Sequence, residues 1–72
     1  MEKQGISKSN KKVSIKSHNV PNNGGCYLGL CKEYILYYDN LEILKLQELD
    51  FDDLGKAKQI ILEVFEKMLL IW

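Results

Sequence analysis

The alternation of hydrophobic and polar residues predicts a strand early in the chain. Over residues 13–20, Val13 and Ile15 fall on one side and polar residues fall between them, which indicates a half-buried strand. Residues 21–25 read Pro-Asn-Asn-Gly-Gly, and this concentration of turn-forming residues predicts a hairpin turn or a short loop.

A second hydrophobic segment follows this turn. Residues 26–38 are rich in aromatic and aliphatic side chains, and they predict one long strand or two shorter ones with a bulge near Gly29. Asp39 and Asn40 come next, and both residue types tolerate the left-handed backbone of a tight turn. The sequence therefore predicts a hairpin that turns at these two residues.

Residues 41–49 are compatible with either a strand or a helix. As a helix, the segment would have Asp39 as its N-cap and Glu42 three residues later, which is the capping-box arrangement. As a strand, it matches the preceding aromatic segment in length, as a hairpin requires. We predict the strand, although hydrophobic periodicity alone does not decide between the two.

Residues 50–72 predict a long C-terminal helix. Asp50 is a suitable N-cap, and Asp52 and Asp53 lie where negative charge favours the helix dipole. The apolar side chains of this segment cover roughly 200° of the helix circumference, whereas packing on one small sheet needs a stripe of about 100°. The surplus predicts a second subunit, a protein partner, or a sheet that curls around the helix.

The flanks of this apolar arc are the predicted interface. A three-stranded sheet would cover the centre of the arc and leave its two sides in water, at a cost of roughly 1.5–3 kcal/mol for each large side chain. We therefore expect a homodimer, or another protein partner, to cover the flanks. The residues predicted to lie in or near this interface are Leu62 and Leu69 on the first flank, Ile60 and Ile71 on the second flank, and Trp72.

Together these elements predict one α+β domain over residues 13–72. Its small antiparallel sheet of about three strands packs against the C-terminal helix, in the order β-β-β-α. Residues 1–12 are predicted to form a flexible basic tail, because their single large aliphatic residue is Ile6 and the rest are too polar to repay the entropy of ordering. The whole chain has 72 residues, which leaves room for one domain.

Charge is unevenly distributed along the chain. Residues 1–25 carry five Lys and one Glu, a net charge of +4, and residues 26–72 carry five Lys and nine acidic residues, a net charge of −4. A basic tail beside tyrosines on a sheet is also typical of proteins that bind single-stranded nucleic acid. For this alternative function, the candidate contacts are Lys8, Lys11, Lys12, Lys16, Tyr27 and Tyr37.

Composition narrows the alternatives further. The chain has no Arg, the residue that most often reads guanine, so the composition argues against sequence-specific recognition of duplex DNA. Scarce Ala and abundant Lys, Ile and Asn suggest an AT-rich coding sequence, from a low-GC bacterium or one of its mobile elements. The sequence shows no secretory signal and no stretch of about 18 apolar residues, the length that a membrane span requires. We therefore expect a cytoplasmic protein.

The residues with catalytic or metal-binding potential are few. His18, Cys26 and Cys31, with Glu33 or Asp39, could supply zinc ligands, but structural zinc sites usually contain two closely spaced cysteine pairs. A thiol nucleophile would need His18 beside one of the cysteines, and a small domain has little room for a substrate cleft. We therefore expect no metal, no cofactor and no catalytic site, and we expect both cysteines to be reduced.

The sequence therefore predicts a small, non-enzymatic protein-interaction or regulatory module. Its expected partner is a second copy of the chain or another protein, and no membrane or small-molecule substrate is indicated. The alternative is a nucleic-acid-binding protein that uses the Lys-rich tail and the Tyr-bearing sheet.

Overall fold

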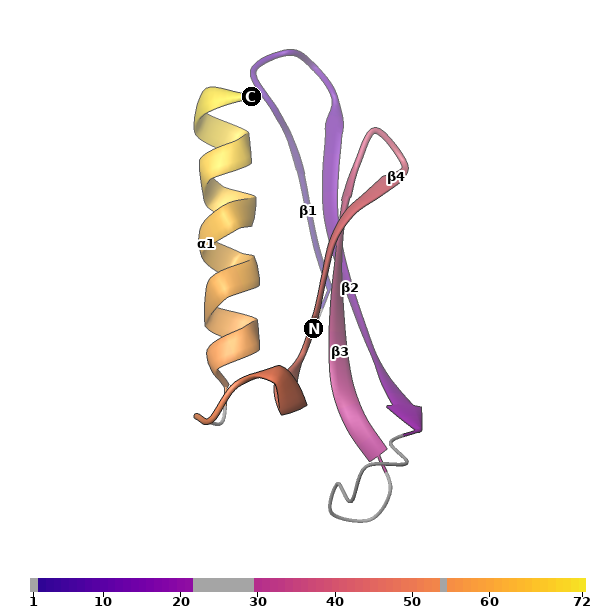
Figure 1. Ribbon diagram of the computed structural model, residues 1–72. Coiled ribbons are helices and arrows are strands. Elements are labelled where there is room, and N and C mark those ends of the chain that lie inside the picture. The colour runs from indigo at the N-terminus through magenta and orange to yellow at the C-terminus, as the bar shows by residue number, and fades with distance from the viewer. Residues whose placement is uncertain (1, 22–29, 54) are drawn as a thin grey trace.

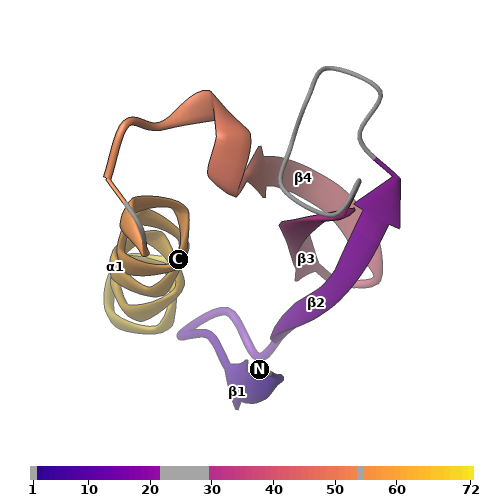
Figure 2. The ribbon, with the colours of Figure 1, turned by 90° about the horizontal axis from the view of Figure 1, so that it is seen from below.

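The computed structural model of the chain describes residues 2–21, 30–53 and 55–72. In this part of the chain an antiparallel sheet of four strands, in the order β1-β2-β3-β4, packs against one α-helix (Figure 1). Seen along the strands, the sheet curves from β4 round to β1, with α1 on its concave side (Figure 2). The predicted α+β class is confirmed, with one more strand than expected. The elements are β1 Lys3–Ile6, β2 Lys12–Pro21, β3 Leu30–Tyr38, β4 Leu41–Gln47, a 3-10 helix η2 Glu48–Asp50 and α1 Lys56–Ile71.

The alternation seen in the sequence sets the inner face of the sheet. Val13 and Ile15 of β2 are buried, and they pair with Tyr38 and Leu36 of β3. These side chains form one core with the face of α1 that turns toward the sheet. The helix contributes its buried residues to this core: Ala57, Ile61, Phe65 and Met68.

The β3–β4 hairpin has the predicted turn. Asp39 and Asn40 have φ values of 53° and 68°, so both residues adopt the left-handed conformation that tight hairpin turns require. The following segment is a strand rather than a helix, which confirms the prediction for residues 41–47. A bulge interrupts its pairing with β3 beside Tyr37.

The N-terminal segment differs from the predicted flexible tail over residues 1–12. Lys3–Ile6 is an edge strand, β1, which pairs with β2 so that Gly5 lies opposite Val13. This strand is joined to the sheet through its backbone, and Ile6 remains exposed. A strand held in this way shows no hydrophobic alternation, which is why the sequence pattern does not reveal it.

The C-terminal helix begins later than predicted. Asp50 lies in the 3-10 helix and is not an N-cap, and α1 starts at Lys56 after Gly55, whose φ is +82°. Phe51 has extended backbone and packs partly buried against the core, which keeps the chain out of helical geometry there. No helix in the described residues is long and apolar enough to cross a membrane.

Candidate functional site

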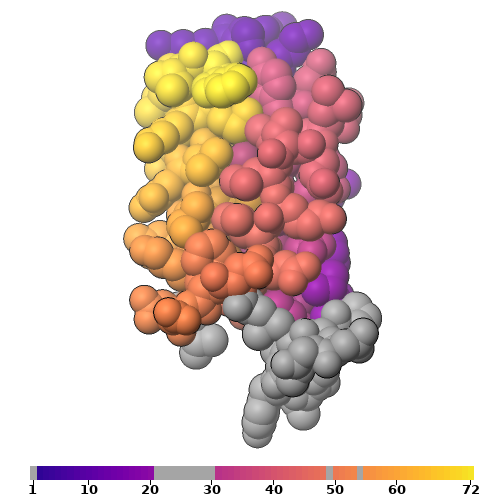
Figure 3. Space-filling view, viewed as in Figure 1, coloured from indigo at the N-terminus to yellow at the C-terminus, as the bar shows by residue number. Residues whose placement is uncertain are grey.

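Exposed apolar side chains gather at the end of the molecule where α1 ends and β4 begins. Trp72 packs edge-on against Tyr38, with ring centroids 5.9 Å apart, and Tyr38 is paired across the β3–β4 hairpin with Leu41. Leu41, Ile71 and Trp72 are 68%, 70% and 56% exposed. We call these three residues, arranged around Tyr38, the terminal apolar surface. In Figure 3 the last turn of α1 (yellow) lies directly beside the first part of β4 (pink).

The position of Trp72 is fixed by the turn between β1 and β2. The Ser9 amide donates to the Trp72 carbonyl oxygen at 3.1 Å, and the Ser9 hydroxyl donates to the same oxygen at 2.6 Å. The Ser9 hydroxyl also lies 2.7 Å from the Tyr38 hydroxyl. These contacts hold the end of the helix against the sheet.

The first predicted interface flank is largely covered by the protein itself. Leu62 and Leu69 are half-buried and pack against the core. Leu69 also lies over Gly5, where a Cβ atom would come within 2.7 Å of Leu69 Cδ2. The added strand β1 therefore occupies the side on which these two leucines were expected to meet a second subunit.

The second predicted flank is more open. Ile60 is half-buried, whereas Ile71 and Trp72 are mostly exposed. Of the predicted interface residues, these last two lie in the terminal apolar surface, and the sequence did not indicate that Leu41 joins them. Leu70 is 64% exposed as well, but it is offset by about 100° around α1 from Ile71.

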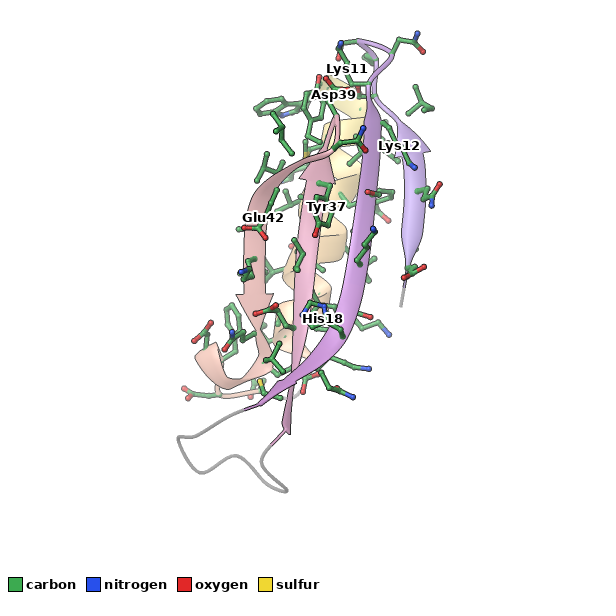
Figure 4. The ribbon with its side chains drawn as sticks, turned by 90° about the vertical axis from the view of Figure 1, so that its right-hand side faces the viewer. Lys11, Lys12, His18, Tyr37, Asp39 and Glu42 are labelled. Atoms are coloured by element: carbon green, nitrogen blue, oxygen red, sulfur yellow. The ribbon has the colours of Figure 1, made fainter. Side chains whose placement is uncertain are left out.

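The predicted nucleic-acid contacts that the structure describes lie on the outer face of the sheet and in the turn between β1 and β2. Lys8 and Lys12 are exposed, Lys11 Nζ lies 3.7 Å from Asp39 Oδ2, and Lys16 Nζ lies 5.5 Å from the centre of the half-buried Tyr37 ring. Figure 4 looks onto this face, with Tyr37 on β3 between β2 and Glu42 of β4.

The tyrosines do not form one platform on this outer face. Tyr34 and Tyr38 lie on the inner face, against the core, and Tyr27 lies outside the described residues. Among the tyrosines that the structure describes, Tyr37 alone remains on the outer face beside the lysines. Stacking of several successive bases therefore has little support from the described part of the sheet.

The buried carboxylate of Glu33 connects the three longer strands, β2, β3 and β4, on the outer face of the sheet. Glu33 of β3 is 5% exposed, and its two oxygens lie 2.9 Å from His18 Nε2 on β2 and 2.8 Å from Gln47 Nε2 on β4. Buried polar groups need such partners. Strand register brings these three residues together, because His18 lies opposite Glu33 and Glu33 lies opposite Gln47. No local sequence motif therefore indicates this contact.

The residues considered for zinc or thiol chemistry are arranged differently from a metal site. Cys31 is a buried free thiol, and Cys26 lies outside the described residues. His18 is engaged with Glu33. Over residues 2–21, 30–53 and 55–72, no three His, Cys, Asp or Glu side chains are grouped so that they could hold a metal ion.

Tyr34 joins the sheet to the segment that leads into α1. Its hydroxyl donates to Glu48 Oε1 at 3.4 Å. Burial, the negative charge of Glu48 and this hydrogen bond all raise the pKa of Tyr34. The phenol is therefore held in its neutral form, as a structural contact.

Comparisons with protein-family models, with curated proteins and with solved structures gave no match to this chain.

Proposed function

We propose that this protein is a non-enzymatic interaction module that binds a second copy of itself through the terminal apolar surface. The observation that carries the proposal is the exposure of Leu41, Ile71 and Trp72 at one end of the fold. Large apolar side chains gain roughly 1.5–3 kcal/mol each from burial, so an ordered group of them is a favourable contact surface. Trp and Tyr are also enriched at protein interfaces.

The geometry of this surface favours a second copy as the partner. Leu41 on the strand side and Ile71 on the helix side are exposed to nearly the same extent, 68% and 70%. A two-fold arrangement that sets the helix side of one copy against the strand side of the other covers both residues in both copies. No different protein is then needed to bury this surface.

The edge of β4 supports packing of side chains rather than formation of a continuous sheet. Its pairing with β3 is interrupted by the bulge, and Lys45 Nζ lies 3.8 Å from Glu42 Oε1 along the strand. Bulges and charged residues are the features by which edge strands resist the addition of another strand. We therefore place the contact between α1 and β4 of the two copies.

Within the described residues, the groups considered for catalysis serve other contacts. The thiol of Cys31 is buried, and His18 is paired with the carboxylate of Glu33. A depression at the sheet edge is lined by Gln4, Gly5, Ile6 and Lys12, which do not form an acid–base pair. These observations support a binding function over a catalytic one.

The test is the mass in solution of the wild type and of matched variants. Light scattering after size exclusion, from low micromolar concentration upward, is expected to give a dimer for the wild type. Leu41→Glu and Ile71→Glu are expected to give monomers, because each places a charge in the contact. Leu70→Glu is the matched control, since it changes a similarly exposed residue on another side of α1.

The control variant, Leu70→Glu, is expected to lose slightly more helix stability than Ile71→Glu. Glu at position 70 would lie one turn after Glu66, and like charges at this spacing are slightly destabilising. A dimer that survives Leu70→Glu but not Ile71→Glu therefore supports the proposed surface. A wild type that stays monomeric at high micromolar concentration overturns it.

A further inference from the structure

The hydrogen-bond pattern around Ser9 has a single consistent assignment. Its hydroxyl donates its one hydrogen to the Trp72 carbonyl oxygen, so it must accept from the Tyr38 hydroxyl at 2.7 Å and from the Ser7 hydroxyl at 3.0 Å. Ser7 in turn accepts from the Lys11 amide at 3.2 Å. The Ser9 hydroxyl thus uses its full donor and acceptor capacity to join the β1–β2 turn, β3 and the end of α1.

This arrangement gives α1 a C-terminal cap from a distant part of the chain. The last carbonyl groups of a helix have no partner within the helix, and here the Trp72 carbonyl receives both the amide and the hydroxyl of Ser9. The Trp72 amide also donates to the Met68 carbonyl at 3.2 Å. The backbone of Trp72 is therefore held on both sides.

The side chains are fixed by the same contacts. Ser9 accepts from Tyr38, and the Tyr38 ring meets the Trp72 ring at an interplanar angle of 67°. The indole keeps one part against Tyr38 and presents the rest to solvent. An anchor that is already ordered loses less conformational entropy on binding than a mobile one.

We infer that Ser9 is the positioning residue of the terminal apolar surface: its hydroxyl holds Trp72 and Tyr38 in the conformation that the second copy binds. This inference rests on the proposed function, because it concerns the same surface. Ser9 is itself exposed in the turn and acts through the two aromatic residues.

The test compares three proteins by sedimentation equilibrium. Ser9→Ala removes the hydroxyl, and its dimer dissociation constant is expected to rise by up to about tenfold, because one net hydrogen bond no longer favours the binding conformation of Trp72 and Tyr38. Ser9→Thr retains the hydroxyl at an exposed position and is expected to restore the wild-type constant to within about twofold.

A second measurement separates positioning from a general loss of stability. The indole N–H of Trp72, the single Trp of the chain, is followed by its ¹⁵N relaxation with Leu41→Glu added to each protein, because this change is expected to keep all three proteins monomeric at the concentrations that relaxation needs. Faster indole motion is expected in Ser9→Ala than in the wild type and Ser9→Thr, with the amide signals of β2 and β3 unchanged.

The outcomes distinguish this inference from the proposed function. A monomeric wild type overturns the proposed dimer, whatever the indole measurement shows. A dimeric wild type whose association and indole motion are unaffected by Ser9→Ala overturns the role of Ser9 alone. Loss of the folded amide spectrum in Ser9→Ala also overturns it, because the residue is then needed for the fold.

Discussion

The two flanks of α1 have similar aliphatic side chains but differ in what covers them. On one flank, Leu69 packs against the core and lies over Gly5 of β1. On the other, Ile71 is 70% exposed, and Leu41 at the start of β4 is 68% exposed. The difference arises at the sheet edges, because β1 presents Gly5, which has no side chain, to the helix, whereas β4 begins near the end of the helix with Leu41 uncovered.

This contrast shows how an edge strand can change which surface of a small protein is available. Without β1, the part of Leu69 that lies over Gly5 would be uncovered, and this flank would also be open to a partner. With β1 in place, the contact surface is restricted to the β4 side. The following predictions test first the covered flank, then the two flanks against each other, and then Tyr34 on the inner face of the sheet.

The largest expected effect comes from filling the space between β1 and Leu69. Gly5→Val places a branched side chain where even a Cβ atom would lie 2.7 Å from Leu69 Cδ2, and overpacking of this kind costs about 1–3 kcal/mol. Urea denaturation measures the loss. Gln4→Val is the control, because Gln4 is exposed on the neighbouring position of the same strand, and equal losses in the two variants would contradict the closed flank.

A smaller change in the free energy of unfolding is expected to distinguish the two flanks directly. Leu69→Ala is expected to lower the free energy of unfolding by about 1–2 kcal/mol, because this half-buried side chain packs against the core. Ile71→Ala is expected to change it by less than about 0.5 kcal/mol in the monomer, because the side chain is already mostly in water. Both values come from urea denaturation of dilute protein, and the reverse order would show that the flanks have been assigned wrongly.

The smallest expected change in stability concerns Tyr34, which lies on the inner face of the sheet, in the core. Its pKa lies above the ordinary 10.0 because of burial first and Glu48 second. The unfolded chain therefore loses this proton at lower pH than the folded chain, so stability is complete below about pH 10 and falls as the pH rises further. Denaturation midpoints in urea at about pH 9 and pH 11 are expected to differ less in Tyr34→Phe than in the wild type. Equal pH dependence in both proteins would contradict this.

Much of the sheet could be predicted because its signals are local. The alternation around Val13 and Ile15 and the left-handed tolerance of Asp39 and Asn40 each depend on neighbouring residues. These features identified β2, the β3–β4 turn and the strand character of β4. The length of the C-terminal apolar pattern likewise identified α1.

The errors concern features that depend on distant residues. β1 pairs with β2 through its backbone. Gly5 has no side chain and so leaves room for Leu69, a residue far along the chain. The helix start was placed too early because Asp50 resembles an N-cap, whereas Phe51 is drawn into extended backbone by its packing on the core.

The candidate site was predicted only in part for the same reason. The breadth of the apolar arc correctly indicated exposed side chains at the end of the C-terminal segment, on Ile71 of α1 and on Trp72 directly after it. It did not indicate which flank the sheet would cover, nor that Ser9 and Leu41 would lie near the end of the helix. A serine in a polar turn and a leucine after a hairpin carry no local signal of such contacts.

The most direct test of the account is sedimentation equilibrium of the wild type, Ile71→Glu and Leu70→Glu at matched concentrations. The two variants place the same charge on adjacent, similarly exposed positions of α1, but only position 71 belongs to the terminal apolar surface. We expect dimers for the wild type and Leu70→Glu and a monomer for Ile71→Glu. A monomeric wild type, or equal association of the two variants, would contradict the account.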